Sequence, residues 1–250
     1  MHVSKKYKFP PLVEAISEFR FATEEGVSFL NFVPTFYERI KEKFPIRGIK
    51  TKYGLKIEES KDKSFADFPK DEIEIYQFKN VENNLIVQVG NDFLAINHLK
   101  EYSNWENYSD VVLNILRLFS DLTKGHILQP SIRYINRISF DKVDSLDLDE
   151  YFKIRIMVPS EIQSKINSLN LRTELWSEDK NNLLTVAFRS DPGKNSNKFV
   201  FFLELGYRFS QGKMEFNQID YWLSNAHKSL NLAFEYCLTE KCKQKFEYAD

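Results

Sequence analysis

Two arginines in the stretch "SIRYINRISF" (131–140) have a spacing that suggests a chemical role. The alternation of a β-strand places Arg133 and Arg137 on one face, and Asn136 among apolar residues on the other. Two guanidinium groups on one face suit three roles: an anion site, a contact with nucleic-acid phosphates, or pairing with acids inside the protein.

The first strand-like stretch offers acidic partners for these arginines. "PLVEAISEFRF" (11–21) alternates strictly and places Glu14 and Glu18 on one face. If the two strands lie antiparallel side by side, Glu14 meets Arg137 and Glu18 meets Arg133. Each cross-strand pair would contribute about 0.2–1 kcal/mol. We therefore favour internal scaffolding over an anion site.

The remaining candidates for catalysis are isolated residues. The four histidines are scattered along the chain: His2, His98, His126 and His227. His227 is the best functional candidate, because it lies beside the apolar stripe of a predicted helix over 218–238, but we favour a hydrogen-bonded or surface histidine. Asp220 and Glu235 share this helix without a one-turn spacing that would orient them together.

A short Glu-x-Lys pattern, Glu59-Ser60-Lys61, matches part of a metal-dependent nuclease signature. Its surroundings, "EESKDKSFADFPKDE", read as a solvated loop. The preceding stretch 39–56 carries seven Lys or Arg residues against one acid, which suits phosphate contacts. We favour a solvated surface there, partly compensated by the acidic run over 58–74.

Composition excludes several common sites. The sequence contains no GxxxxGK[ST], GxGxxG, HExxH or GxSxG motif, and only eight glycines are present to form phosphate-binding loops. Cys237 and Cys242 lack the spacing and the second pair of a zinc knuckle. We assign no catalytic, cofactor-binding or metal-binding residue and expect no cofactor.

Charge and hydropathy point to a cytoplasmic, soluble globular protein. The net charge of −1 removes a general case for nucleic-acid binding, and two cysteines in 250 residues suit a reducing compartment. The N-terminus has no apolar signal region, and no apolar run of membrane-spanning length occurs.

The periodicity of the first half predicts a strand, a helix, several strands and a long helix. After the strand at 11–21, we expect a helix over 29–45 with Pro34 in its first turn. Antiparallel strands follow at 52–59, 72–79, 84–90 and 92–99. A helix over 103–122 has capping-box spacing at Ser103 and Glu106, and Gly125 follows its end.

The second half repeats this order. It begins with the strand at 131–140, followed by a short link at 148–152, a strand at 154–159 and a short helix at 160–169. Strands at 171–178, 182–191 and 198–210 form a meander, and the helix over 218–238 closes it.

We therefore predict an α+β fold built by internal duplication, with halves 1–126 and 127–250 in one compact structural unit. A continuous curved antiparallel sheet would pack on the long helices. This element order resembles helix-grip and TATA-binding-protein-like folds, in which two repeats can join through their first strands.

Several stretches together carry a family resemblance: "PPLVEAISEFRF", "FYERIKEKFP", "LIVQVGNDFLAIN", "YSNWENY", "IRYINRISF" and "AFEYCLTEKCKQKF". They resemble a sporadically distributed prokaryotic family of proteins of similar length, known by a serial number. The resemblance implies a compact bacterial protein without an established enzymatic activity, and it carries over no catalytic residues. Sporadic distribution is associated with mobile or defence loci.

The leading functional hypothesis is a non-enzymatic binding protein that acts through a protein partner, in a defence or toxin–antitoxin-type setting. A homo-oligomer is an open option, nucleic acid is not favoured, and no membrane association is expected. The alternative is a small-ligand sensor or enzyme with an aromatic-lined cavity between sheet and helices. A metal-dependent nuclease is the third hypothesis.

Overall fold

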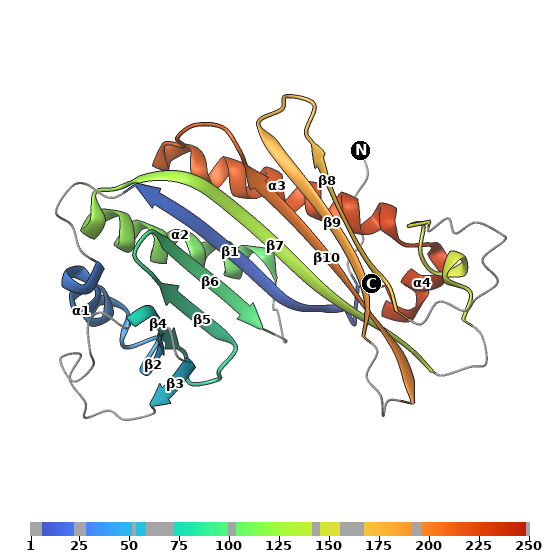
Figure 1. Cartoon of the computed structure of the whole chain (residues 1–250), viewed down its shortest axis with the longest axis horizontal. Coiled ribbons are helices and arrows are strands. Elements are labelled where there is room, and N and C mark those ends of the chain that lie inside the picture. Colours follow the sequence, from blue (N-terminus) through green and yellow to red (C-terminus); the bar gives the residue numbers. More distant parts are fainter. Residues whose placement is uncertain are drawn as a thin grey trace. The chain divides into compact units, whose positions relative to one another are not determined.

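The computed structural model describes residues 7–22, 29–51, 54–58, 73–99, 104–141, 146–155, 168–191 and 197–248. Its strands are β1 (Leu12–Ala22), β2 (Ile46–Thr51), β3 (Gly54–Glu58), β4 (Ile73–Lys79), β5 (Leu85–Val89), β6 (Phe93–Leu99), β7 (His126–Asp141), β8 (Asn170–Trp176), β9 (Asn182–Asp191) and β10 (Lys198–Phe209). Its helices are α1 (Phe29–Ile40), α2 (Trp105–Thr123), α3 (Phe216–Cys237) and α4 (Glu240–Lys243), with short 3-10 turns at Leu148–Glu150 and Gln244–Phe246 (Figure 1).

The fold is α+β, with one open antiparallel sheet. Hydrogen-bonded neighbours follow the order β3-β2-β4-β5-β6-β1-β7-β10-β9-β8. The first strands of the two predicted halves, β1 and β7, are therefore neighbours in the sheet. Among the described residues, no helix is both long and apolar enough to cross a membrane.

The chain divides into two compact units. The α2 unit comprises residues 14–132 and 208–223, and the terminal unit comprises residues 1–13, 133–207 and 224–250. This spatial division runs through β7 and α3, and so does not coincide with the halves 1–126 and 127–250. The division into compact units does not test whether the two halves are repeats of each other, so the duplication remains a prediction.

In the α2 unit, helix α2 anchors the sheet through one buried tyrosine. Tyr108 is 1% exposed; its hydroxyl donates to the carbonyl oxygen of Ile96 at 2.8 Å and lies 3.0 Å from the hydroxyl oxygen of Ser17. These bonds satisfy polar groups that burial would otherwise leave unpaired. Aromatic rings from β1, α1, β4 and α2 fill the surrounding core: Phe21, Phe32, Phe36, Phe78 and Phe119.

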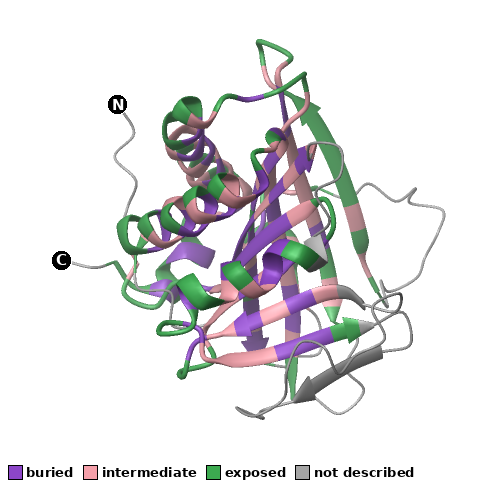
Figure 2. Ribbon diagram, turned by 90° about the vertical axis from the view of Figure 1, so that its left-hand side faces the viewer, coloured by how far each residue is buried: buried purple, intermediate pink, exposed green. Residues whose placement is uncertain are grey.

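In the terminal unit, α3 packs on the sheet through Ala226 and Leu230, both 0% exposed. Figure 2 shows purple buried residues where helices face strands and green residues on the outer helix surfaces. A second aromatic cluster fills this core: Phe140, Phe152, Phe188 and Phe201, whose ring centroids lie 4.5–6.1 Å apart. Alternation along β7 explains its part, since Ile138 and Phe140 are buried while Arg137 and Asp141 are exposed.

The strands predicted in the described parts of the chain are confirmed, except the one at 154–159. The structure adds β2, which the sequence analysis missed. Ile154 and Arg155 lie outside any strand, and the rest of that predicted strand lies outside the described residues, as does most of the helix predicted over 160–169.

Two predictions about helix starts were wrong in detail. Helix α1 begins at Phe29, so Pro34 lies inside the helix and not in its first turn. Asn104, not Ser103, caps α2: its side-chain oxygen accepts a hydrogen bond from the backbone N–H of Asn107. Gly125 follows the end of this helix as predicted, and Lys124 before it takes the left-handed conformation, with φ of 47°.

Candidate functional site: a basic pocket and a terminal clasp

A surface pocket of about 340 Å³ lies in the terminal unit; we call it the basic pocket. Its lining comes from the segment before β1, the end of β7, the start of β10 and the C-terminal segment. The lining residues are Phe9, Pro10, Pro11, Arg137, Ile138, Ser139, Asp141, Lys198, Lys245 and Phe246.

The pleat of β7 determines which side chains reach this pocket. Arg137 and Asp141 point outward because their neighbours Ile138 and Phe140 point into the core. The backbone N–H of Arg137 donates to the carbonyl oxygen of Pro11 at 2.8 Å, so the segment before β1 stays against β7. This bond places the prolines beside the arginine.

Basic side chains outnumber acidic ones in the pocket lining by three to one. Lys198 lies 3.7 Å from the carboxylate of Asp141, a long and exposed ion pair. The ammonium group of Lys245 lies 5.1 Å from the centre of the Phe140 ring. Among the described residues, no acid forms an ion pair with Arg137, so its guanidinium group can receive an anion.

The two ends of the described chain form one wall of the pocket. The backbone N–H groups of Lys8 and Phe9 donate to the carbonyl oxygens of Glu247 and Phe246, each at 2.9 Å. The rings of Tyr7 and Tyr248 stack with centroids 5.5 Å apart. We call this pairing of residues 7–9 with 246–248, together with Glu235, Glu240 and Lys243, the terminal clasp.

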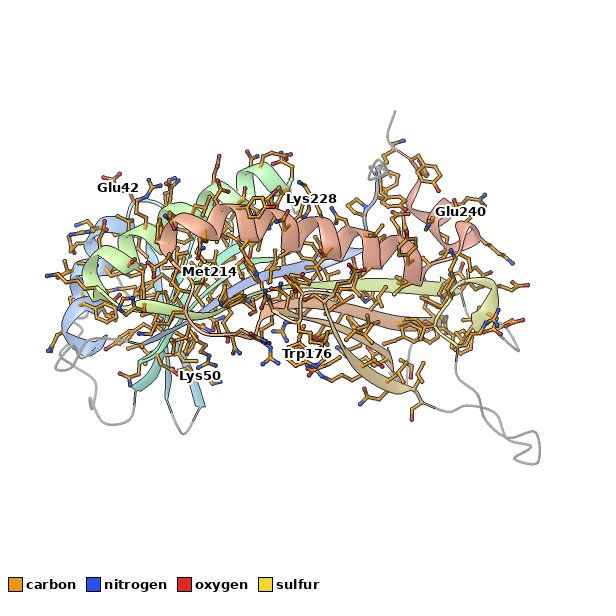
Figure 3. All side chains as sticks on the ribbon, turned by 90° about the horizontal axis from the view of Figure 1, so that it is seen from above. Glu42, Lys50, Trp176, Met214, Lys228 and Glu240 are labelled. Atoms are coloured by element: carbon orange, nitrogen blue, oxygen red, sulfur yellow. The ribbon has the colours of Figure 1, made fainter. Side chains whose placement is uncertain are left out.

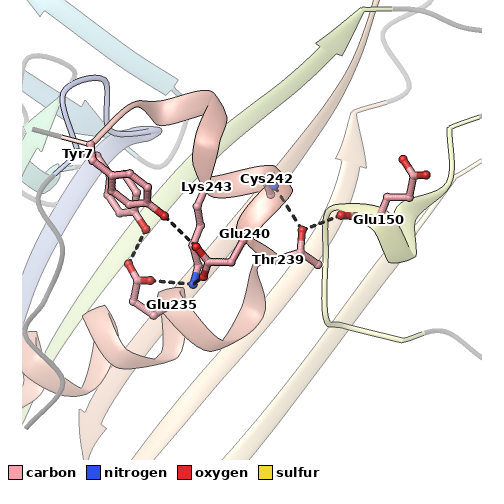
Figure 4. A network of polar contacts seen from close by, with 8 residues as sticks. Tyr7, Glu150, Glu235, Thr239, Glu240, Cys242 and Lys243 are labelled. Atoms are coloured by element: carbon pink, nitrogen blue, oxygen red, sulfur yellow. Dashed lines mark hydrogen bonds and ion pairs between the residues drawn. The ribbon is translucent and has the colours of Figure 1, made fainter.

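A charged network holds the clasp to α3 (Figure 4). The ammonium group of Lys243, whose residue is only 5% exposed, lies 2.9 Å from the carboxylate of Glu235 and 3.1 Å from that of Glu240. The hydroxyl of Tyr7 donates to Glu235 at 2.6 Å, and the hydroxyl of Tyr248 donates to Glu240 at 2.9 Å. Glu235 therefore accepts from both ends of the chain.

The environment of the clasp shifts the pKa of two of its groups. Burial by itself lowers the pKa of Lys243, but hydrogen bonds and charges from Glu235 and Glu240 outweigh it, and the net shift is upward. Burial, followed by the hydrogen bond to Glu235, raises the pKa of the Tyr7 phenol. Both groups therefore stay protonated at neutral pH.

A second contact holds α4 beside the clasp. The hydroxyl of Thr239 donates to the backbone carbonyl of Glu150 at 2.6 Å and accepts from the backbone N–H of Cys242 at 3.3 Å (Figure 4). Lys241 forms an ion pair with the Glu150 carboxylate. These bonds join the turn after β7 to the C-terminal segment that carries Lys245.

The two cysteines have no features of a nucleophile. Burial raises the pKa of Cys237 to about 11 and that of Cys242 to about 12. Among the described residues that line the basic pocket there is no histidine or cysteine. The site as described suits binding of an anion.

The partners of the strand charges differ from the predicted ones. The guanidinium group of Arg133 pairs with Glu204 on β10 at 3.1 Å. Glu14 accepts from the side-chain amide of Asn97 at 2.7 Å, and Glu18 pairs with Arg20 at 3.2 Å. Neither predicted pair, Glu14–Arg137 or Glu18–Arg133, is present among the described residues. For Arg133 the reason is that β7 has a second neighbour, β10, which supplies the acid.

Asn136, which the sequence places among apolar residues, forms a hydrogen bond inside the sheet. It is 5% exposed, and its side-chain amide donates to the backbone carbonyl of Leu203 at 3.2 Å. The bond satisfies a buried donor between β7 and β10. Arg137, on the opposite face of β7, lines the basic pocket, so the structure separates the two arginines by role.

The described histidines are not part of the pocket. His227 lies 2.7 Å from the Tyr134 hydroxyl through Nδ1 and 3.0 Å from the Asn231 amide through Nε2, which makes it a hydrogen-bonded link between α3 and β7. His98 is buried, with Nδ1 2.8 Å from the carbonyl oxygen of Leu99, and His126 is exposed. His2 lies outside the described residues.

The nuclease pattern at 59–61 and most of the acidic run over 58–74 lie outside the described residues. Within the described part of the basic stretch 39–56, Arg47 lies over the Tyr37 ring at 5.2 Å and Lys41 pairs with Glu38. Asp220 is exposed, whereas Glu235 belongs to the clasp. No group of three or more His, Cys, Asp or Glu side chains that would suit a metal ion occurs in the described parts of the chain.

A second polar network crosses the strands of the α2 unit; we call it the amide ladder. Gln77 donates to Gln88 at 3.1 Å, Gln88 donates to Asn97 at 2.9 Å, and Asn97 donates to Glu14. Every donation therefore runs in one direction, from β4 through β5 and β6 to the carboxylate on β1. These three contacts join members of the ladder to one another, and the described residues there suggest no ligand site.

Sequence reasoning missed Tyr7, Lys243 and Lys245, which build the clasp and the pocket. No motif marks these residues, and a cluster of lysines in "TEKCKQKF" (239–246) was the one available signal. No protein-family model matches the chain, and no curated protein sequence matches it.

Proposed function

We propose that this chain is a non-enzymatic binding protein that acts through a protein partner and receives an acidic segment of that partner in the basic pocket. The observation that carries the proposal is the convergence of Arg137, Lys198 and Lys245, from three separate segments, against the single acid Asp141. Basic groups gathered in a concave surface attract carboxylates and orient them.

The chemistry of Arg137 favours a carboxylate partner. A guanidinium group offers donors in a planar fork that matches both oxygens of a carboxylate. The exposed ring of Phe9, with Pro10 and Pro11, offers apolar contact beside the charges. An extended acidic peptide with an apolar neighbour suits this combination.

Fluorescence anisotropy with a dye-labelled hexaglutamate peptide tests the proposal. We expect saturable binding that weakens as salt is added, because the contacts are exposed charges. Arg137→Ala and Lys245→Ala should each weaken binding at least fivefold. Lys228→Ala, which removes an exposed lysine from α3 outside the pocket lining, is the matched control and should leave binding unchanged.

Absence of peptide binding, or equal binding by wild type and Arg137→Ala, would overturn the proposal. Because Arg137 is exposed, its substitution should leave the fold intact, and circular dichroism verifies this for each variant.

The size of the pocket favours a small anionic ligand as the second candidate. About 340 Å³ lies at the lower end of the volumes of small-molecule sites. Inorganic phosphate that competes with the peptide at equal or lower concentration, or a metabolite retained in native mass spectrometry, would favour this candidate. The aromatic cavity expected between sheet and helices differs in place and lining from the basic pocket.

We also propose that the fold arose by internal duplication and is related to helix-grip or TATA-binding-protein-like folds. Each half begins with a long strand and ends with a long helix, and β1 and β7 are neighbours in the sheet, which supports the proposal. Superposition of residues 12–123 on 126–237 tests it. Failure of β1 and α2 to match β7 and α3 together would contradict duplication.

The cellular setting is part of the same proposal. We place the chain in the bacterial cytoplasm, within the serial-numbered family that its motifs resemble, in a defence or toxin–antitoxin-type locus. The neighbouring genes test this setting: a toxin, nuclease or restriction component supplies a concrete partner, and its acidic segments become the first peptides to titrate.

A further inference from the structure

Among the described strands, β8 ends the order of the sheet and pairs with β9 alone. Six of its seven residues are exposed, among them Leu175 at 49% and Trp176 at 58%. Figure 3 shows Trp176 across the strands from α3, where Lys228 is labelled. An edge with unpaired backbone groups and a large exposed ring is a template for another strand.

The sequence of this edge is complementary to itself. Reversing residues 171–175, Leu-Arg-Thr-Glu-Leu, about Thr173 places Arg172 opposite Glu174 and Leu171 opposite Leu175. In an antiparallel pair, residues directly opposite each other project from the same face. Both the charges and the apolar side chains of β8 therefore find a complement in a second copy of β8.

We propose that two copies of this chain associate through antiparallel pairing of β8 with β8, with the two-fold axis at Thr173. This arrangement is isologous: each contact between Arg172 and Glu174 occurs twice. It makes one sheet continuous through both copies, and removes an exposed edge that would favour aggregation.

The charges on β8 support this register. Within one chain, the guanidinium group of Arg172 already lies 2.9 Å from the carboxylate of Glu174 on the same face. In the dimer these two pairs would form a cluster of four alternating charges across the two-fold axis. A parallel pairing in register would instead place like charges opposite each other, which opposes association.

Trp176 would contribute to the same interface. With the axis at Thr173, Trp176 lies opposite Asn170 of the second copy, and exposed tryptophans often dominate the binding energy of an interface. None of these residues lines the basic pocket, so the dimer is independent of the proposed peptide site, and either proposal can fail alone.

Charge reversal tests the dimer in the full-length chain. Sedimentation equilibrium over the micromolar range should show a monomer–dimer equilibrium. Glu174→Arg, or Arg172→Glu alone, should raise the dissociation constant at least tenfold, because two favourable cross-strand pairs become repulsive. The double substitution Arg172→Glu with Glu174→Arg restores opposite charges and should recover the dimer.

Glu178→Arg is the matched control, since it makes the same charge change at an exposed residue outside β8. It should leave the dissociation constant unchanged. A monomer at every concentration, or a dimer that Glu174→Arg leaves intact, would overturn the proposal. Lack of rescue by the double substitution would do the same, and would leave β8 as an edge for a different protein.

A cross-link tests the register directly. Thr173 is the single β8 position that meets its own copy, so Thr173→Cys should form an intermolecular disulfide under mild oxidation. Glu178→Cys should not form one at a comparable rate. Cys237 and Cys242 should stay silent in this assay, because burial raises both their pKa values to about 11 or above. Equal cross-linking at 173 and 178 would contradict the two-fold axis at Thr173.

Discussion

The two units satisfy their polar side chains in opposite ways. The amide ladder of the α2 unit uses neutral groups from strands that follow each other closely in the chain, and ends on the single carboxylate of Glu14. The terminal clasp uses charged groups that include a buried lysine, and the bond from Tyr7 to Glu235 joins residues 228 positions apart. Loss of one residue of the amide ladder, or a change of pH, should therefore change the free energy of unfolding little through the ladder. The same changes should have a large effect through the terminal clasp.

Loss of the buried lysine should have the largest effect. Lys243→Ala removes the cation shared by Glu235 and Glu240, and leaves Glu235, itself mostly buried, without its ion pair. We expect a loss of about 2–4 kcal/mol in the free energy of unfolding, measured by urea denaturation. Lys228→Ala, an exposed lysine on α3, should change it by less than about 0.5 kcal/mol.

Lys243→Met sharpens this prediction, because it keeps the side-chain stem and removes only the charge. We expect a smaller loss than for Lys243→Ala, since packing is retained. A loss below about 1 kcal/mol for Lys243→Ala would mean that water replaces the ammonium group, and the contrast between clasp and ladder would not hold.

Alkaline pH should weaken the terminal unit. Lys243, Tyr7, Cys237 and Cys242 all have a folded-state pKa above the ordinary value, so the folded chain retains protons that the unfolded chain loses. The free energy of unfolding should therefore stay level up to about pH 9, where an ordinary cysteine titrates, and then fall through pH 11. Urea midpoints at half-unit steps from pH 7.5 measure this.

Replacing both cysteines by alanine separates their contribution from that of the clasp. The onset of the decline should move from about pH 9 to about pH 10, where ordinary tyrosine and lysine titrate. A stability that rises with pH over this interval would contradict the assigned pKa directions.

The middle of the amide ladder should be less sensitive than the clasp. Asn97 is 6% exposed and bonds to both Gln88 and Glu14, so Asn97→Ala should cost about 1–2 kcal/mol in the free energy of unfolding. Asn97→Asp places a second carboxylate against Glu14 and should cost more at neutral pH than at pH 4. Equal losses at the two pH values would show that Glu14 does not face residue 97.

Features that depend on residues close together in the sequence, such as strand alternation, could be predicted. Strict alternation along β1 puts Val13, Ala15, Ser17, Phe19 and Phe21 on one face, because a strand has a period of two whatever its partners. The last four are buried and Val13 is half-buried, while Ile16 on the opposite face is buried as well. The sequence analysis missed β2, "IRGIKT", where Gly48 and two cations weaken the strand signal.

Long-range partners could not be read from periodicity. A strand has two neighbours, and the sequence does not say which one supplies the opposite charge, so Arg133 was assigned to Glu18 and pairs with Glu204. The clasp depends on Tyr7 meeting Glu235, and no pattern in either segment names the other. The amide ladder needed the diagonal geometry of β5 and β6, since Gln88 stands opposite Ala95 and bonds to Asn97.

The far end of the ladder should show the smallest effect and tests its direction. Gln77 donates one hydrogen bond to Gln88 from a partly exposed position, so Gln77→Ala should cost about 0.5 kcal/mol in the free energy of unfolding. The amide nitrogen of Gln88 donates to Asn97, and the carbonyl oxygen of Gln88 is the atom that faces residue 77. Gln77→Glu keeps nearly the same size, but its carboxylate would face the carbonyl oxygen of Gln88, and both groups are hydrogen-bond acceptors. It should therefore lower the free energy of unfolding more than Gln77→Ala does. Equal costs by urea denaturation would mean that the amides reverse freely, and the one-way order that distinguishes the ladder from the clasp would be lost.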